Sequence, residues 1–231
     1  MEAQADSQKL LLSQYGHLEE MTEQLSVAAQ HGDTARVHEL LKQGLSPNHF
    51  DSAGFLPLHY ACARGHGDVG RLLLEFGSDH SAYLTGYSPM ELSARSGSLE
   101  IMKDLLYFGA DVEEAGQGGR PPLVSAAAHQ HLDVMKLLLD NGADINSRDV
   151  KGNTALHEAV RLKEPVDFVY LLLRRGADSK LSNTDEKNPM EVSCTHTHTH
   201  TRARAHTHAH TSRFTLAILT SRVTLPSNTI V

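Results

Sequence analysis

The chain has 231 residues, of which 40% are hydrophobic and 21% charged, a composition typical of soluble globular proteins. No uninterrupted apolar run approaches the roughly 18 residues that a membrane-spanning helix needs, so we expect no membrane segment. The net charge is −7, and 28 acidic residues stand against 17 basic ones before Cys194, which disfavours nucleic acid as a partner.

The N-terminal segment 1–24 is predicted to cap the structure that follows it. Its residues 10–25, LLLSQYGHLEEMTEQL, have the pattern of an amphipathic helix. The segment lacks the basic start of a secretory signal, and the chain's two cysteines, Cys62 and Cys194, are too few for a disulfide scaffold. We therefore expect a cytoplasmic and/or nuclear protein with free thiols.

Two markers then recur along the chain at steps of 32 to 34 residues. The first is a glycine that follows a Leu-Leu pair, at Gly44, Gly77, Gly109, Gly142 and Gly176. The second marks expected helix starts, at Pro57, Pro89, Pro122, Ala155 and Pro189. Because two independent markers keep the same step, the chain is predicted to be a repeat protein.

The second repeat, DSAGFLPLHYACARGHGDVGRLLLEFGSDHS, shows how each unit is built. Its first residues predict a hairpin loop, and Pro57 suits the first position of a helix, where a missing N–H leaves nothing unpaired. Gly65 is expected to end this helix, and a second helix stops at Gly77. Such short helices are unstable alone, so neighbouring repeats must stack to bury their apolar faces.

The pattern Gly-x-Thr-Pro-Leu-His at this period resembles the ankyrin repeat. It is carried by GFLPLHYACARGH (54–66), GYSPMELSARSGS (86–98), GRPPLVSAAAHQH (119–131) and GNTALHEAV (152–160). The resemblance covers residues 25–193 and implies an all-α fold, an ankyrin-repeat solenoid of stacked helix-turn-helix units with hairpin loops. Gln130 departs from the pattern by replacing the glycine between two helices, and we expect its unit to fold nevertheless.

We predict units near 25–50, 51–83, 84–115, 116–148 and 149–182, a partial sixth unit over 183–193, and a disordered low-complexity His/Thr tail over 194–231. In the sixth unit Asn188 can cap a helix that Pro189 begins. Because this unit breaks off inside its first helix, Leu171, Leu172 and Val192 are expected to face water and stability to be lowest at this end.

The tail poses the question of a metal site. His196 and His200, or His206 and His210, have the i, i+4 spacing of ligands on one helical face. No core holds them in place, however, so we predict neither a metal site nor a cofactor. A CA-dinucleotide tract in DNA translates as alternating threonine and histidine, and we interpret the tail as translated simple-sequence DNA.

No catalytic motif is recognised: the chain has no Ser-His-Asp set, phosphate-binding loop, HExxH or CxxC, so no enzyme is predicted. His59 and His157 occupy the Leu-His position of the repeat, where the resemblance implies that the imidazole bonds to backbone of the same or the next repeat. Cys62 is expected to be a small buried side chain.

The resemblance implies that partners bind the hairpin tips and the exposed ends of the first helices. The hairpin positions are Phe55, Tyr87, Arg120 and Asn153, and the helix-end positions are Arg64, Arg95, His129 and Arg161. The second set lines up basic side chains in successive repeats of an acidic domain, a row that would favour an acidic peptide. The same row can equally be a set of solvated cations that complement the helix dipoles. Phe55 and Tyr87 are the expected aromatic anchors.

We therefore predict a monomeric, non-catalytic scaffold or adaptor that binds another protein. The alternative hypothesis is a truncated isoform of a larger multidomain protein, whose ankyrin stack targets an enzymatic or ubiquitin-ligase-adaptor domain missing here. The fold alone does not distinguish the two.

Overall fold

The structure, a computed structural model, describes residues 19–82, 86–116, 118–162 and 165–192. Within these ranges the chain forms helices and loops and contains no β-strand. It divides into two compact units, Met1–Pro122 and Leu123–Val231. The tail over 194–231, predicted to be disordered, and residues 10–18 of the predicted N-terminal helix lie outside the described residues.

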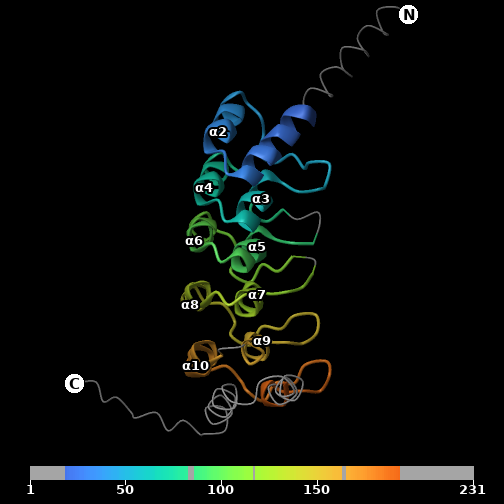
Figure 1. Cartoon of the computed structure of the whole chain (residues 1–231), viewed down its shortest axis with the longest axis vertical. Helices are drawn as coiled ribbons and strands as arrows, with labels where there is room; N and C mark the ends of the chain where they lie inside the picture. Colours follow the sequence, from blue (N-terminus) through green and yellow to red (C-terminus); the bar gives the residue numbers. More distant parts are fainter. Residues whose placement is uncertain (1–18, 83–85, 117, 163–164, 193–231) are drawn as a thin grey trace, which may run out of the picture. The chain divides into compact units, whose positions relative to one another are not determined.

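Successive pairs of helices build the first unit. A helix over residues 19–31 precedes α2 (Thr34–Lys42), and the next pairs are α3 (Pro57–Arg64) with α4 (Gly67–Glu75) and α5 (Pro89–Ser96) with α6 (Leu99–Tyr107). In Figure 1 the first helices of the pairs stand in one row and α2, α4 and α6 in another, with the hairpin loops projecting on the side of the first row. Because α3 packs on both α4 and α5, and α4 on α6, the predicted stacking of repeats is confirmed.

Helices α3 and α5 begin at the predicted prolines, and α3 ends before the predicted glycine. Pro57 and Pro89 are the first residues of α3 and α5, and Ser88 Oγ accepts a backbone hydrogen bond of 3.0 Å at the start of α5. Gly65 and Gly97 follow these helices with a φ of 75°, a left-handed conformation that costs glycine little.

The core of the first unit is made of apolar side chains from every helix. The side chains of Leu25, Leu40, Leu58, Leu73, Met90, Ile101 and Leu105 are fully buried. Each contributes about 1.5–3 kcal/mol relative to an exposed side chain. The prediction for Cys62 is confirmed, since it is 0% exposed and burial raises the pKa of its thiol to about 12.

The helix over residues 19–31 runs across the boundary that we predicted between residues 24 and 25. Leu25 and Ala29, one turn apart, are fully buried, whereas Glu19 and Glu23 are exposed. The described part of the predicted capping segment is therefore continuous with the first helix of the first repeat.

The second unit repeats the same pairing. It contains α7 (Pro122–Ala128), which starts at the boundary between the units, then α8 (Leu132–Asp140), α9 (Ala155–Ala159) and α10 (Val166–Arg174). The helix predicted to begin at Pro189 is present over residues 189–192. Asn188 caps it by accepting a bond of 3.1 Å from the Glu191 N–H, while the Glu191 carboxylate accepts one of 2.8 Å from the Asn188 N–H.

The expectation that Leu172 and Val192 face water is wrong. Leu172 is 0% exposed and Val192 is 4% exposed, and Leu171 is half-buried. Residues 183–192 supply a hairpin and a first helical turn at this end of the second unit. One direct link is the 3.0 Å hydrogen bond between His157 Nε2 and the Lys187 carbonyl.

Candidate functional site

Three of the hairpin loops share one local arrangement, which fixes the residues that follow them. Asp51, Asp149 and Asn183 each begin a hairpin, and one side-chain oxygen of each accepts two backbone hydrogen bonds of 2.8–3.1 Å from residues two and four positions later. A backbone bond of 2.9–3.0 Å also joins the first and fifth residues of each hairpin. The fifth residue, such as Phe55, is therefore held rigidly just before the first helix.

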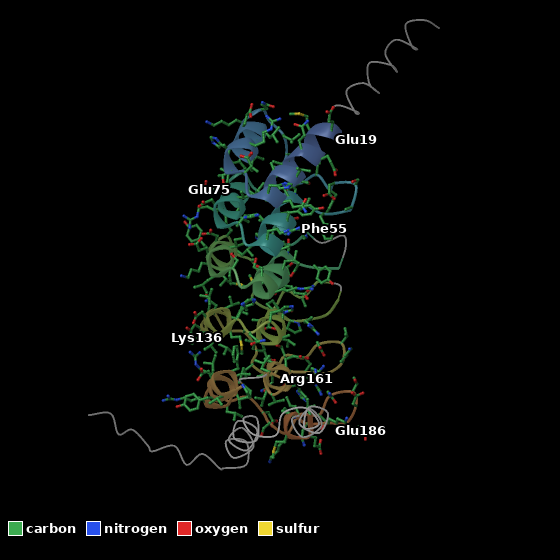
Figure 2. The ribbon with its side chains drawn as sticks, viewed as in Figure 1. Glu19, Phe55, Glu75, Lys136, Arg161 and Glu186 are labelled. Carbon is green, nitrogen blue, oxygen red and sulfur yellow. The ribbon has the colours of Figure 1, made fainter. Side chains whose placement is uncertain are left out.

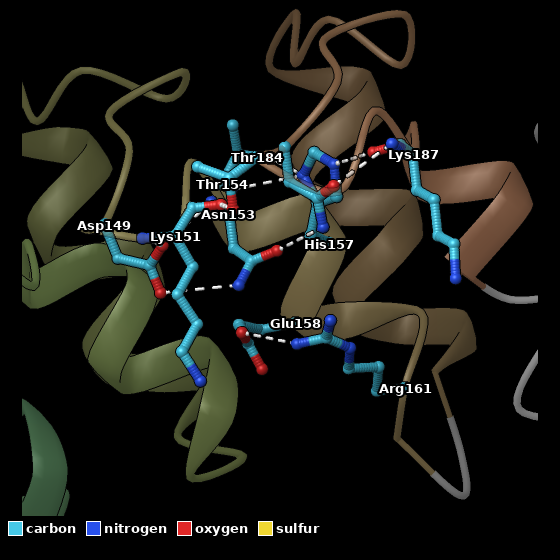
Figure 3. A network of polar contacts seen from close by, with 10 residues as sticks. Asp149, Lys151, Asn153, Thr154, His157, Glu158, Arg161, Thr184 and Lys187 are labelled. Atoms are coloured by element: carbon cyan, nitrogen blue, oxygen red, sulfur yellow. Dashed lines mark hydrogen bonds and ion pairs between the residues drawn. The ribbon is translucent and has the colours of Figure 1, made fainter.

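Asn153 does not face a partner, contrary to the sequence prediction. It is 2% exposed, and its Oδ1 accepts a hydrogen bond of 2.9 Å from Asn183 Nδ2 in the next hairpin. Its own Nδ2 points to Asp149 Oδ2 at 3.5 Å (Figure 3). Because its side-chain amide bonds to the next hairpin, Asn153 links two repeats and does not belong to an exposed binding surface.

His157 has the structural role that the resemblance implied. Its Nδ1 accepts a bond of 3.1 Å from the Thr154 N–H, and its Nε2 bonds to the Lys187 carbonyl of the next repeat (Figure 3). His59 Nδ1 likewise accepts a bond of 3.1 Å from the Leu56 N–H. Burial lowers the pKa of both imidazoles, so near neutral pH they are uncharged parts of the helix starts.

A close backbone contact joins two hairpins of the first unit. The Gly118 N–H donates a bond of 3.0 Å to the Gly86 carbonyl. A Cβ atom on Gly116 would lie 2.2 Å from that carbonyl oxygen, so any other residue there would force the loops apart. This approach fixes the loop that precedes Tyr87.

Two of the predicted site residues meet on the surface of the first unit. The Arg95 guanidinium lies over the Tyr87 ring, 5.9 Å from its centroid. Tyr87 is 38% exposed, and Arg95, near the end of α5, is exposed. Stacking on a ring orients a planar guanidinium, a group whose N–H geometry suits a carboxylate.

Phe55 packs inside its own repeat and is half-buried. Its ring centroid lies 5.7 Å from that of Tyr60 and 5.8 Å from that of His59. Sequence reasoning missed Tyr60, although it stands four residues before Arg64 on α3, a spacing that places both on one helical face. Burial, followed by a hydrogen bond with Asp51, raises the pKa of Tyr60 to about 12.

The predicted basic row does not keep one register in the first unit. Arg64 is the last residue of α3, whereas Arg95 is the last but one of α5. Each residue turns the helix by about 100°, so the two side chains leave their helices in different directions. Both are exposed, and Arg120, in the hairpin before α7, is half-exposed.

In the second unit the two remaining positions of the row are partly occupied by local partners. His129 is exposed, and its Nδ1 lies 2.9 Å from the Ser125 carbonyl. Arg161 forms an ion pair of 2.9 Å with Glu158, and its side chain is 34% exposed. Because Glu158 compensates the charge of Arg161, an incoming carboxylate gains less there than beside an arginine with no acidic neighbour.

The ranges that the structure describes contain neither a cluster of metal ligands nor a membrane-spanning helix. No three histidine, cysteine or acidic residues gather there as metal ligands would. No helix in the described part of the chain is long and apolar enough to cross a bilayer. The tail residues His196, His200, His206 and His210 lie outside it.

Comparison with known proteins adds a family. The family model for ankyrin repeats, which spans three copies, matches residues 25–116 and again residues 90–185. The potassium channel AKT2/3 of Arabidopsis thaliana is 37% identical over 164 residues, 69% of this chain and 20% of the channel. Ankyrin repeat and SOCS box protein 16 of Homo sapiens is 33% identical over 186 residues, 76% of this chain and 40% of that protein.

A third similar protein is neither a channel nor a SOCS box protein by name. The B-cell lymphoma 3 protein homolog of Mus musculus is 29% identical over 163 residues, 68% of this chain and 36% of that protein. The chain thus spans less than half the length of each of these relatives. What is similar is the stack of repeats, and the relatives differ in what surrounds it.

Proposed function

Because the chain belongs to the ankyrin repeat family, we propose that it is a non-catalytic scaffold or adaptor that binds another protein. Ankyrin repeats generally mediate protein–protein interactions, and repeat stacks do so through extended surfaces. The geometry that supports this proposal is the stacked pair of Tyr87 and Arg95, held exposed on a rigid loop and helix.

The proposed binding surface lies in the first unit, along the hairpins and the ends of α3 and α5. Tyr87 and Arg95 are its centre, with Phe55, Tyr60 and Arg64 beside them in the preceding repeat. An aromatic ring and an arginine are the side chains that most often dominate binding at interfaces. We expect the partner to present an acidic peptide segment, because a stacked guanidinium can donate two N–H groups to a carboxylate.

The proposal extends to the oligomeric state and the cellular compartment. We propose a monomer in the cytoplasm and/or the nucleus. The small number of cysteines supports a reducing compartment, because Cys62 and Cys194 are too few for a disulfide scaffold.

The proposal is tested by capture of partners with the full chain as bait at physiological salt. The test variant is Tyr87→Ala/Arg95→Glu. The matched control is Tyr170→Ala/Arg174→Glu, because Arg174 lies over the exposed Tyr170 ring at 5.8 Å on α10, a second-helix position. We expect partners that the control retains and the test variant loses. Equal loss from both variants, or from neither, would contradict the proposed surface.

A second candidate function is suggested by the relatives. Two of the similar proteins, Ankyrin repeat and SOCS box proteins 16 and 3 of Homo sapiens, combine such repeats with a SOCS box. We propose as the alternative that this stack targets a further domain of a longer protein. Sequencing of transcripts across the codons for residues 185–200 distinguishes the two, because the alternative requires a product in which the sixth repeat is completed.

A further inference from the structure

An aromatic pair breaks the polar pattern at the ends of the second helices. The residues that precede the repeat glycines are Gln43, Phe76, Phe108, Asn141 and Arg175. Only Phe76 and Phe108, in the second and third repeats, are aromatic. Phe76 is 40% exposed, Phe108 is 36% exposed, and the neighbouring Tyr107 is 85% exposed.

These three rings form what we call the outer aromatic surface. The Tyr107 and Phe108 rings meet edge to face with centroids 5.4 Å apart. Phe76 lies at the end of α4, which packs directly against α6, the helix that ends at Tyr107. In Figure 2 Glu75 lies on the second-helix side of the unit and Phe55 on the hairpin side. The outer aromatic surface belongs to the ends of second helices, whereas Tyr87 precedes the first helix α5 and Arg95 lies within it, so the two surfaces are on different elements.

Carboxylates border this surface. Glu75, Asp79 and Asp111 are exposed and stand within four residues of one of the rings along the chain. Asp79 and Asp111 are close enough to Glu114 that, after burial, their charges contribute to raising its pKa to about 7. The C-terminal ends of α4 and α6 add the negative ends of two helix dipoles.

Three residues with basic side chains stand near the surface, and one of them, His38, meets the Phe76 ring edge to face with centroids 6.2 Å apart. Arg71 is held by Asp104, with its Nε 3.2 Å and its terminal nitrogen 2.9 Å from the two carboxylate oxygens. Lys103 is exposed and stands one helical turn before Tyr107. The exposed rings therefore have acidic neighbours and little positive charge beside them. Such a surface suits a ligand that brings cationic side chains, such as arginine or lysine.

We propose that the outer aromatic surface, Phe76, Tyr107 and Phe108, binds an arginine-rich segment of a partner protein. Arginine stacks on the rings and donates N–H groups to the flanking carboxylates, which lysine does less well because its charge is compact and strongly hydrated. One oxygen each of Asp79 and Asp111 already accepts an N–H of its own loop at 2.9 Å, and a purely apolar partner would offer no donor to their other oxygens or to Glu75. This site differs in place and charge from the acidic-peptide surface, so each can fail without the other.

The test is fluorescence anisotropy of the full chain with a fluorescein-labelled peptide, Arg-Leu-Arg-Gly-Arg-Leu-Arg. Tyr107→Ser is the test variant, because a ring 85% exposed can be removed without disturbing the fold. We expect it to weaken binding about three- to tenfold. Lys103→Gln removes the nearby cation and is expected to strengthen binding about twofold.

Two controls locate the effect. Tyr170→Ser removes a ring that is 51% exposed on α10 and lies under Arg174, and it should leave the affinity unchanged. Tyr87→Ala/Arg95→Glu should not weaken binding either. The proposal is overturned if Tyr107→Ser binds as the unmodified protein does, if Tyr170→Ser weakens binding equally, or if a peptide with glutamate for arginine binds as tightly. It is also overturned if Tyr107→Ser abolishes self-association of the protein alone, which would make a second copy the occupant.

Discussion

At the scale of single residues, Gln130 is held in a conformation that suits glycine. Its φ is 66°, close to the 75° of Gly65 and Gly97 at the same place in other repeats. A side chain in this region strains the backbone. The turn between α7 and α8 therefore forms against a local preference, because the packed helices on both sides dictate it.

We predict that Gln130→Gly raises the free energy of unfolding by about 1 kcal/mol. Gln130→Asn should give a smaller gain, since asparagine tolerates positive φ better than glutamine. Urea denaturation followed by circular dichroism measures both. A loss of stability in the glycine variant would mean that the side chain of Gln130 contributes more than its backbone strain removes.

Glu114 contributes to the pH dependence of the first unit near neutral pH. Burial first, and then the charges of Asp111 and Asp79, raise its pKa from 4.5 to about 7. The folded protein therefore holds this proton more tightly than the unfolded chain. The resulting stabilisation is complete below the unfolded pKa and is lost as the pH rises through about 7.

We predict that Glu114→Gln is more stable than the unmodified protein at about pH 8, because it lacks the carboxylate charge that folding disfavours. The gain should be about 1 kcal/mol, since that charge is partly exposed and is screened by solvent. Near pH 4 the two should unfold alike, since the carboxyl is then protonated in both states. Asp111→Asn, which removes one of the two neighbouring charges, should give a smaller gain at high pH. Thermal unfolding at both pH values decides, and a gain in acid instead of base would contradict the assignment.

Some residue roles follow from the sequence and others do not. Pro57, Gly65 and Cys62 were predicted correctly, because helix starts, turns and small core residues depend on their immediate neighbours. Asn153 was predicted wrongly, because a residue after a turn glycine can face outwards or towards the next hairpin. Only the structure reveals Asn183 as its partner.

At the scale of elements, the hairpins of the second unit are joined by polar side chains as well as by helix packing. Asn183 bonds to Asn153 and accepts two backbone N–H groups of its own loop, and Thr184 N–H donates a bond of 2.9 Å to the Lys151 carbonyl. Loss of one side chain would leave several buried polar groups without partners. The hairpin should therefore unfold as a unit.

We predict that Asn183→Ala lowers the free energy of unfolding by about 1–3 kcal/mol. Asn141→Ala is the control, because this exposed amide makes a single local bond of 2.8 Å to the Leu137 carbonyl. Its change should stay below about 0.5 kcal/mol. Thermal unfolding monitored by circular dichroism compares them, and equal effects would show that the link between hairpins adds no stability.

Helix positions could be predicted to within a residue or two where proline and glycine mark them. Pro57 and Gly65 bracket α3, and Pro189 begins the last described helix, as expected. The start of the first repeat could not be found, because the helix over residues 19–31 has no such marker and its apolar pattern continues through the predicted boundary.

At the scale of the molecule, stability is expected to vary along the chain. Each repeat contacts only its neighbours, so repeats with two neighbours are held more firmly than those at an end. We predict that amide protons exchange most slowly in residues 51–148 and fastest in residues 183–192. Hydrogen exchange read by mass spectrometry measures this directly. Uniform protection through residue 190 would contradict the prediction.

The surface shows what the sequence leaves undetermined. The chain is acidic, and its basic residues could be placed on helix ends from the repeat spacing alone. Which of them meets an aromatic ring depends on the direction in which its side chain leaves the helix. That direction differs between Arg64, the last residue of α3, and Arg95, the last but one of α5. The outer aromatic surface could have been noticed by comparing the residues that precede the repeat glycines, but its exposure could not.

The measurement that tests the central claim most directly is site-specific photo-crosslinking in cells. A photoreactive phenylalanine replaces Tyr87 in one version of the full chain and Tyr170 in another, both exposed tyrosines that stack under an arginine. We predict a defined protein adduct at position 87 that is absent at position 170 and is lost when Arg95→Glu is added. The same adducts at both positions, or none at position 87, would contradict binding through the hairpin and first-helix surface.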